Sequence, residues 1–443
     1  MSFVARPGNS PTWADDLPNG WTADWVKWSV AFASTKPTDE DTEKLPYISN
    51  EDIASWTGKM LKEAPEPADK EGRVFQRDDV LFNKLRPYLA KVYHADFDGI
   101  SSGELLNLRS SDRVLPRFLF HVLSSSAFID TINAETFGTK MPRADWETVG
   151  HQPLPLPDLD TQRRIAGYLD DKTARIDALI EKKRALLDRL AEKRQALITR
   201  AVTRGLNPSA PLKDSGIDWL GKVPAHWEVK KLKYLTPKVS VGIVVTPANW
   251  YAEEGTLALR GLNIRPMGFD LQETRLISDE GHEFHAKSQL HEGDLVSVRT
   301  GDPGTTAVVT EEFDGCNCID LVIIRRPVEM LPRFLGWFLN SSVAKVQYQL
   351  GSEGALQAHF NVDTSKETLV AVPSVDEQSA IVDHLEASLQ AHDEAVTKIT
   401  SSVEKLTEYR AALVTAAVTG KIKALLVADH KESAAPMRVI QTH

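Results

Sequence analysis

The sequence has few cysteines and no long apolar run. Cys316 and Cys318 are the only cysteines among 443 residues, too few for the disulfide framework of a small secreted protein. No stretch approaches the ~18 consecutive apolar residues that a transmembrane helix needs, and the N-terminal residues have no apolar segment of the kind found in signal peptides. These absences favour a cytoplasmic protein. At ~150 residues per domain, the length suggests about three domains.

The sequence also lacks the signatures of independent catalysis. There is no G-x-x-x-x-G-K-[ST] motif for binding phosphates, and no Asn-Pro-Pro-aromatic or Asp-Pro-Pro-aromatic tetrapeptide of the amino-methyltransferase type. His282, His285 and His291 lie near one another, but without the H-E-x-x-H spacing of a zinc helix. We therefore expect no catalytic residues, no metal site and no cofactor in this chain. Cys316 and Cys318 are expected to be buried thiols.

Two windows of the sequence contain no proline and almost no glycine or aromatic residue. Between Pro157 and Pro208 the only glycines are Gly167 and Gly205, and between Pro373 and Pro436 the only glycine is Gly420. Long stretches without helix breakers predict helices, whereas the remaining sequence, rich in Pro, Gly and Trp, predicts compact mixed domains. Each helix would cover ~40 residues, or about 60 Å at 1.5 Å per residue.

Both windows show the 4-3 spacing of a coiled-coil seam. In the first window the apolar seam positions are Leu169, Ile176, Ile180, Leu187, Leu190 and Leu197, and in the second they are Leu385, Leu389, Val396, Ile399, Val403, Leu406 and Leu413. A helix about 60 Å long has no core of its own, so the two windows are expected to pair. Asp158 and the Ser374/Glu377 capping box mark the two helix starts.

The chain repeats itself at a fixed offset. The pentapeptide LPRFL occurs at 115–119 and again at 331–335, and Phe-Asp-Gly at 97–99 recurs at 313–315, both at an offset of 216. Upstream the offset becomes 206, because Pro18-x-x-Trp21 matches Pro224-x-x-Trp227. Several matches at one offset indicate a duplicated unit. The expected order is globular domain, long helix, globular domain, long helix, with a pseudo-twofold axis relating the copies and the helices holding the domains apart.

This pattern predicts an α+β protein with an antiparallel coiled coil. The expected parts are a first globular domain at 1–157, a helical region at 158–205, a linker at 206–222, a second globular domain at 223–373, a helical region at 374–422 and a tail at 423–443.

Basic residues recur near turns in both copies, although the net charge is −10. A strand that delivers Arg or Lys into a Gly/Pro-rich loop can place donors against phosphate or a guanine edge. The candidate DNA contacts are Lys84, Arg86, Lys140 and Arg143 in the first copy and Arg260, Arg299, Gln357 and His359 in the second.

Several segments together resemble a known family. They are 153–157 leading to 162–165, the helix end at 194–203, the linker at 213–221 followed by 223–228, and the stretch from 79–82 to 84–88. In these segments, which are spread over almost the whole chain, the sequence is similar to the DNA-specificity (S) subunit of Type I restriction-modification systems. The second copy departs from the pattern, since Val370-Ala-Val-Pro373 replaces the fuller proline run and its helix is acidic.

The resemblance implies a non-catalytic subunit with two target-recognition domains. Each domain reads half of a bipartite, gapped DNA target, and the paired helices fix the gap and dock two copies of a methyltransferase subunit. That partner uses S-adenosylmethionine to methylate adenine, and restriction (motor-nuclease) subunits can join the complex.

Three alternatives stay open at the level of sequence. The chain could be a coiled-coil protein–protein scaffold that never touches nucleic acid, or an enzyme with an unrecognised active site. It could also be the specificity subunit of a methylation-only or phage-defence complex.

Overall fold

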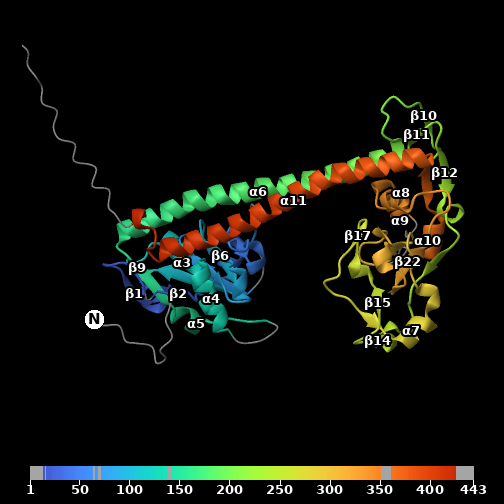
Figure 1. The fold of residues 1–443 in the computed structure, drawn as a ribbon. Coiled ribbons are helices and arrows are strands. Elements are labelled where there is room, and N and C mark those ends of the chain that lie inside the picture. Colours follow the sequence, from blue (N-terminus) through green and yellow to red (C-terminus); the bar gives the residue numbers. More distant parts are fainter. Residues whose placement is uncertain are drawn as a thin grey trace, which may run out of the picture. The chain divides into compact units, whose positions relative to one another are not determined.

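The computed structural model describes residues 13–14, 16–62, 65–67, 71–136, 141–350 and 361–425. They form two compact units: unit 1 holds the chain up to Arg184 and again from Ser401, and unit 2 holds Ala185–Thr400. The long helices α6 (Leu159–Arg204) and α11 (Val375–Val418) each contribute to both units (Figure 1). The boundaries at Ala185 and Ser401 are separated by the same offset as the sequence repeat. Each unit therefore contains one globular domain, the start of its own helix and the end of the other helix.

The globular part of unit 1 is built on two small sheets. Their strand orders are β2-β8-β5-β6 and β3-β7-β4, while β1 pairs with β9. The strands are β1 (Thr22–Trp25), β2 (Val30–Phe32), β3 (Tyr47–Ile48), β4 (Gly72–Phe75), β5 (Val80–Asn83), β6 (Val92–His94), β7 (Gly99–Ser102), β8 (Leu105–Ser110) and β9 (Pro153–Leu156). The helices are α1 (Val26–Ser29), α2 (Asp39–Lys44), α3 (Pro116–Leu123), α4 (Ser126–Ala134) and α5 (Trp146–Gly150), with 3₁₀ turns η1 (Asn50–Asp52) and η2 (Pro87–Leu89).

Unit 2 repeats this plan with additions. Its main sheets run β13-β22-β19-β20 and β14-β18-β15-β21, β12 pairs with β23, and β16 pairs with β17. The strands are β12 (Glu228–Lys231), β13 (Val239–Val241), β14 (Tyr251–Ala252), β15 (Thr256–Leu259), β16 (Ile264–Arg265), β17 (Gly268–Phe269), β18 (Leu276–Ile277), β19 (Leu295–Val298), β20 (Thr306–Val308), β21 (Asn317–Cys318), β22 (Leu321–Ile324) and β23 (Leu369–Val372). The helices are α7 (Asp279–Phe284), α8 (Pro332–Leu339), α9 (Ser342–Leu350) and α10 (Val362–Glu367).

The long helices begin and end as local sequence dictates. At the start of α6 the Asp158 carboxylate accepts the Thr161 N–H at 2.9 Å, and at the start of α11 the Ser374 hydroxyl accepts the Glu377 N–H at 3.4 Å. Both predicted N-caps are therefore confirmed. Each helix is followed by a glycine with positive φ, Gly205 (+68°) and Gly420 (+71°), the backbone conformation that commonly ends a helix. The bounds Leu159–Arg204 and Val375–Val418 compare with the predicted regions 158–205 and 374–422.

The segment predicted as a linker, 206–222, contains most of a β-hairpin. β10 (Leu212–Asp214) pairs antiparallel with β11 (Lys222–Pro224). Gly216 and Gly221 adopt positive φ between the two strands, which allows the chain to reverse there. Of the predicted tail, 423–443, the structure describes only the 3₁₀ turn η8 (Lys423–Leu425), and the rest lies outside the described residues.

The same glutamine contact docks each globular domain on its helix. Gln162 of α6 accepts the Leu115 N–H at 2.8 Å and donates to the Pro157 carbonyl at 3.0 Å. Gln378 of α11, the equivalent residue of the second copy, accepts the Leu331 N–H at 2.7 Å and donates to the Pro373 carbonyl at 3.0 Å. Both glutamines are fully buried. The duplicated sequence thus fixes the helix and the sheet of each copy in the same local arrangement.

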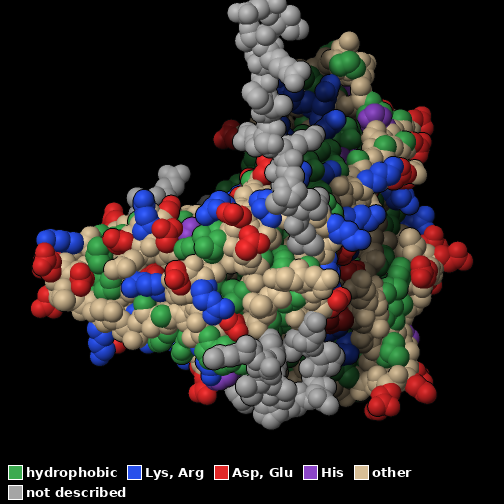
Figure 2. All heavy atoms as spheres, turned by 90° about the vertical axis from the view of Figure 1, so that its left-hand side faces the viewer, with side chains coloured by type: hydrophobic (Ala, Val, Ile, Leu, Met, Phe, Trp, Pro, Cys, Tyr) green, Lys and Arg blue, Asp and Glu red, His purple; other side chains and the backbone are tan. Residues whose placement is uncertain are grey.

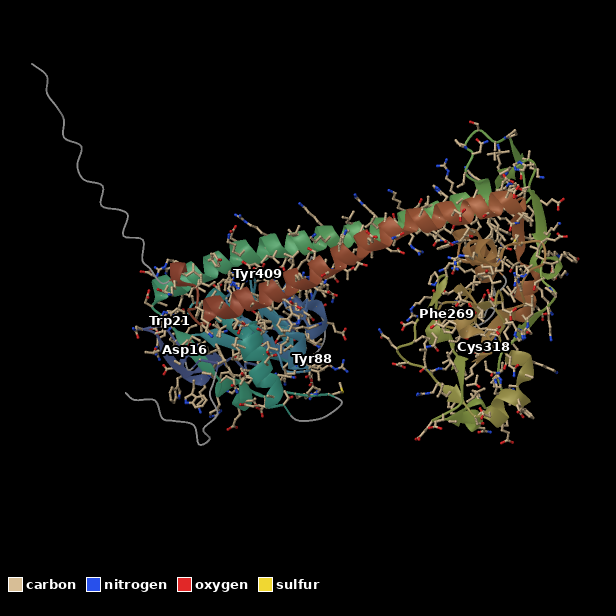
Figure 3. The ribbon with its side chains drawn as sticks, in the orientation of Figure 1. Asp16, Trp21, Tyr88, Phe269, Cys318 and Tyr409 are labelled. Atoms are coloured by element: carbon tan, nitrogen blue, oxygen red, sulfur yellow. The ribbon has the colours of Figure 1, made fainter. Side chains whose placement is uncertain are left out.

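Each unit also packs its domain on the end of the other copy's helix. In unit 1, Trp21 (labelled in Figure 3) lies against Gly420, where an added Cβ would come within 3.2 Å of the indole. In unit 2, Trp227 lies against Gly205 at the same 3.2 Å. A Cβ at Gly420 would clash with Pro18, at 2.4 Å, and one at Gly205 would crowd Trp227, so the sequence matches at 18–21 and 224–227 mark this contact.

No helix among the described residues is long and apolar enough to cross a membrane.

Candidate nucleic-acid interface

The predicted seam of the paired helices faces inward along its described length. Leu169, Ile176, Ile180, Leu385, Leu389 and Leu413 are buried, and Leu187, Leu190, Leu197, Val396, Ile399, Val403 and Leu406 are half-buried. Figure 1 shows α6 and α11 running side by side. In unit 1, Arg164 donates to the Leu425 carbonyl and Arg410 pairs with Asp177, so the chain directions are opposed. The predicted antiparallel coiled coil is confirmed.

Polar residues at the seam have partners on the other helix. The Arg410 guanidinium binds the Asp177 carboxylate through Nε at 2.7 Å and Nη2 at 3.2 Å, and its Nη1 donates to the Trp56 carbonyl at 3.0 Å. In unit 2, His392 Nε2 lies 2.9 Å from the Leu190 carbonyl oxygen, and Arg194 lies 3.5 Å from Asp393. These contacts fix the register of the two helices, since each residue reaches one particular partner.

An ionic network with one buried member, His121, joins α3 to α6 in unit 1. Asp170 accepts hydrogen bonds from His121 and from Arg117, both at 2.8 Å. Although burial opposes ionisation of Asp170, these hydrogen bonds hold its pKa down at about 2. Burial lowers the pKa of His121, and the Asp170 carboxylate only partly opposes that shift. The equivalent pair in unit 2 is Arg333 with Glu386, at 2.6 Å.

In unit 1 the structure brings three of the predicted DNA contacts to one place. We call Lys84, Arg86, Glu104 and Arg143 rim 1. Lys84 follows directly after β5, and its N–H donates to the Glu104 carbonyl at 2.9 Å. Arg143 forms a bridge with Leu85 and donates from Nη2 to the Glu104 carboxylate at 2.9 Å. Burial lowers the pKa of Lys84, and the nearby Arg73 and Arg143 add to the shift, while Glu104 opposes it.

Rim 1 also presents exposed side chains. Arg86 is exposed and adopts a left-handed backbone with φ of 53°, which costs about 1–2 kcal/mol for a residue with a Cβ. Tyr88 (labelled in Figure 3), two residues further on, is exposed, and so is Met141, which precedes Pro142, the residue whose carbonyl accepts the Arg86 N–H at 2.8 Å. A strained, exposed arginine next to an exposed ring is typical of a binding loop.

In unit 2 the two described candidates also lie near each other. We call Val244, Val245, Arg260, Arg299 and Asp320 rim 2. Arg260 follows β15 and Arg299 follows β19, and a Cβ added at Gly261 would lie 3.9 Å from the Thr300 carbonyl oxygen. The Arg299 guanidinium binds the Asp320 carboxylate, and Arg260 donates to the Glu273 carbonyl at 3.1 Å.

The remaining candidates, Lys140, Gln357 and His359, lie outside the described residues. Sequence reasoning missed the two carboxylates of the rims, Glu104 and Asp320. The sequence does carry a signal for them, because these acids are separated by the repeat offset and each directly precedes a repeated strand, β8 or β22. The candidates predicted from sequence were limited to cations, an amide and a histidine, so the acids were not among them.

The face drawn in Figure 2 is mixed in charge. Figure 2 shows lysine and arginine side chains interspersed with aspartate and glutamate on the face in view, with no extended region of one sign. A nucleic-acid contact on this face would be local, since no broad basic region in view attracts phosphate there.

The other sequence candidates are structural in this fold. Both cysteines are buried, and Cys318 (labelled in Figure 3) lies where a Cβ added at Gly242 would clash with it. His282 Nδ1 contacts the side-chain oxygen of Asn317, and His285 caps α7. Within the described part of the chain, no group of three or more His, Cys, Asp or Glu side chains could hold a metal ion.

Comparison with known proteins gives a consistent family. The family model of the Type I restriction modification DNA specificity domain matches residues 31–189. The Type I restriction enzyme EcoDI specificity subunit of Escherichia coli is 27% identical over 169 residues, 36% of this chain and 36% of that protein. The EcoBI specificity subunit of Escherichia coli is 24% identical over 346 residues, 75% of this chain and 72% of that protein. The chain thus matches about a third of the first relative's length and nearly three quarters of the second's.

The fold is also similar to a solved structure. The chain in a structure described as "Structural basis underlying complex assembly and conformational transition of the type I R-M system" superposes with a TM-score of 0.72 at 20% identity. The superposition covers 92% of this chain and all of that chain.

Proposed function

We propose that the chain is a Type I restriction-modification specificity subunit, which reads a bipartite DNA target without catalysing a reaction itself; its similarity to the specificity domain and to two specificity subunits supports this. Each unit would read one half of the target, and the bases between the halves would be unread. The observation that carries this proposal is the duplication. The same sheet, the same glutamine contact and the same rim position occur twice, but the side chains at the two rims differ. Two domains with the same fold but different side chains at their rims suit a target whose halves differ in sequence.

The partners follow from this role. We propose two copies of a methyltransferase subunit, which bind the paired helices and hold S-adenosylmethionine, and restriction subunits in a nuclease-competent complex. A base inside a duplex must be flipped out before its amino group can be methylated. In this proposal the flipped adenine enters the pocket of the methyltransferase subunit, and the present chain only places that subunit over the correct base pair.

The test uses the full chain together with the methyltransferase subunit. Binding is measured for duplexes that carry the methylated motif and for duplexes with the same composition in scrambled order, at several salt concentrations. We expect tighter binding to the motif and a linear fall of log K with log salt, because phosphate contacts release counterions. No binding to either duplex would favour the scaffold interpretation.

A second arm addresses catalysis. The chain alone is incubated with S-adenosylmethionine and target DNA, and transfer of the labelled methyl group is followed. We expect no transfer by the chain alone and transfer when the methyltransferase subunit is added. Transfer by the chain alone would overturn the non-catalytic role.

A further inference from the structure

We infer that Glu104 and Asp320 are positioning residues, each of which holds an arginine so that it can read the guanine of a G·C pair in the major groove. The inference rests on the proposed function and deepens it, because it names the base pair and the residues. The arginines are Arg143 in unit 1 and Arg299 in unit 2.

The register of the sheets places the two acids at the same point. The last pair between β5 and β8 is Asn83 with Leu105, and the last pair between β19 and β22 is Val298 with Leu321. Glu104 and Asp320 are the residues before Leu105 and Leu321. Each acid therefore stands at the open end of its strand pair, where the sheet stops and a loop begins.

In unit 2, Asp320 attaches the Arg299–Asp320 pair to the sheet. Asp320 adopts φ of 52°, and its N–H donates to the Ile243 carbonyl at 2.9 Å. Arg299 donates to Asp320 through Nη1, while its Nε is buried and has no hydrogen-bond partner among the described residues. The guanidinium is thus anchored at one nitrogen and, within the described part of the chain, Nη2 remains available for a ligand. A bidentate guanine contact needs two donors in a fixed direction.

Other side chains of rim 2 are suited to contacts in a groove of duplex DNA. Val244 and Val245 follow Ile243, the residue that binds Asp320, and they are 48% and 76% exposed. Exposed valines at a reading site can contact thymine methyl groups. Arg260 lies on the same rim, where a second cation can contact a phosphate.

In unit 1 the same point is built from different residues. Lys84 follows β5 directly, as Arg299 follows β19 in unit 2. The arginine that binds the acid of rim 1 is instead Arg143, which an isolated β-bridge holds beside Leu85. Glu104 binds Arg143 with Oε1, and its Oε2 is buried without a partner among the described residues. Because Oε2 is buried, Glu104 can hold Arg143 through Oε1 but cannot itself contact a base.

A purely structural role explains these pairs poorly. Exposed ion pairs contribute about 0–1 kcal/mol to stability, whereas a buried polar atom without a partner destabilises the fold by more than that. Both rims carry such an atom, Arg299 Nε in one and Glu104 Oε2 in the other. The ion pairs alone therefore do not explain why these residues stand at the rims.

The test compares variants of the full chain in complex with the methyltransferase subunit, using duplexes in which each target position is changed in turn. Arg299→Ala is expected to reduce discrimination at one G·C position of one half-site by roughly 5-fold to 150-fold. Arg299→Lys keeps the charge but removes the fork, so it should lose the same discrimination with less effect on affinity. Asp320→Ala should act at that same position, and Asp320→Asn, which keeps an acceptor, should restore most of the discrimination.

Glu104→Ala provides the matching arm in unit 1 and should change one position in the other half-site only. Arg333→Ala is the control, because it breaks an arginine–carboxylate pair of the same unit away from rim 2, and it should leave the preferred bases unchanged. Equal weakening on all sequences by Arg299→Lys or Asp320→Ala, or unchanged discrimination in both, would overturn the inference. If the unaltered complex shows no bipartite preference at all, the proposed function itself fails.

Discussion

Arg410 and Asp177 form an ion pair between α11 and α6 with little access to water. Their side chains are 13% and 10% exposed, and the guanidinium also binds the Trp56 carbonyl. Removing one partner of a buried pair leaves an uncompensated charge, which typically destabilises a protein by about 3–5 kcal/mol. Arg410 continues the 4-3 spacing between Leu406 and Leu413, but its partner could not be predicted from sequence, because pairing depends on the register of two distant segments.

Arg410→Ala should therefore lower the free energy of unfolding of unit 1 by about 3–5 kcal/mol. Urea unfolding followed by circular dichroism measures this change. Arg175→Ala is the control, since Arg175 and Asp171 form an exposed pair within α6, and it should change stability by less than about 1 kcal/mol. Similar values for the two variants would mean that the Arg410 pair does not stabilise the paired helices.

The His121–Asp170 pair makes stability depend on pH. The pKa of both groups is lowered in the folded state, to about 2 for Asp170. The unfolded chain therefore binds protons more readily, and stability must fall as pH decreases. The loss begins as pH falls below about 6.5 for His121 and below about 4 for Asp170, where the unfolded groups start to bind protons.

Thermal unfolding at pH 7.5 and pH 5.5 tests the histidine contribution. We expect the midpoint to fall on acidification, and to fall less in His121→Gln, because all other histidines are common to both proteins. An equal fall in both proteins would show that His121 is not responsible.

At the scale of elements, the helices were predictable and the strands were not. The absence of proline over 158–207 and the 4-3 spacing are local signals, so α6 and α11 could be located from sequence. The strands are mostly two to four residues long and pair with partners far away, as β2 does with β8. Their pairing is decided by nonlocal packing. The rims depend on that pairing, so the acids Glu104 and Asp320 could not be assigned a role from sequence.

The seam itself can be tested with adjacent residues of α6. Ile180 is buried at the seam, whereas the adjacent Leu179 lies off the seam and is 43% exposed. Ile180→Asp would bury an unpaired charge and should destabilise the protein by several kcal/mol. Leu179→Asp should have little effect. The measurement is the helical melting transition together with assembly with the methyltransferase subunit. Equal behaviour of the two variants would contradict the seam.

At the scale of the whole molecule, we propose that the paired helices set the number of unread base pairs. The helix end at 197–203 is a poor place to test this, because Ile198, Ala201 and Val202 belong to the core of unit 2. A better place is the unit boundary, at Arg184–Ala185 in α6 and Thr400–Ser401 in α11.

Insertion of three heptads into both helices at these boundaries keeps the seam in phase. The added 21 residues lengthen each helix by about 31 Å at 1.5 Å per residue, close to the ~34 Å of one turn of DNA. We expect the same two half-sites with a gap longer by roughly nine or ten base pairs. An unchanged gap would mean that the helices do not set the spacing.

The central claim is that two separate units each read one half of a target. The most direct test replaces the globular part of unit 2, residues 223–373, with that of another specificity subunit and sequences the methylated adenines in cells that also express the methyltransferase subunit. We predict that one half of the methylated motif changes while the other half keeps its sequence. Changes in both halves, or in neither, would contradict the account.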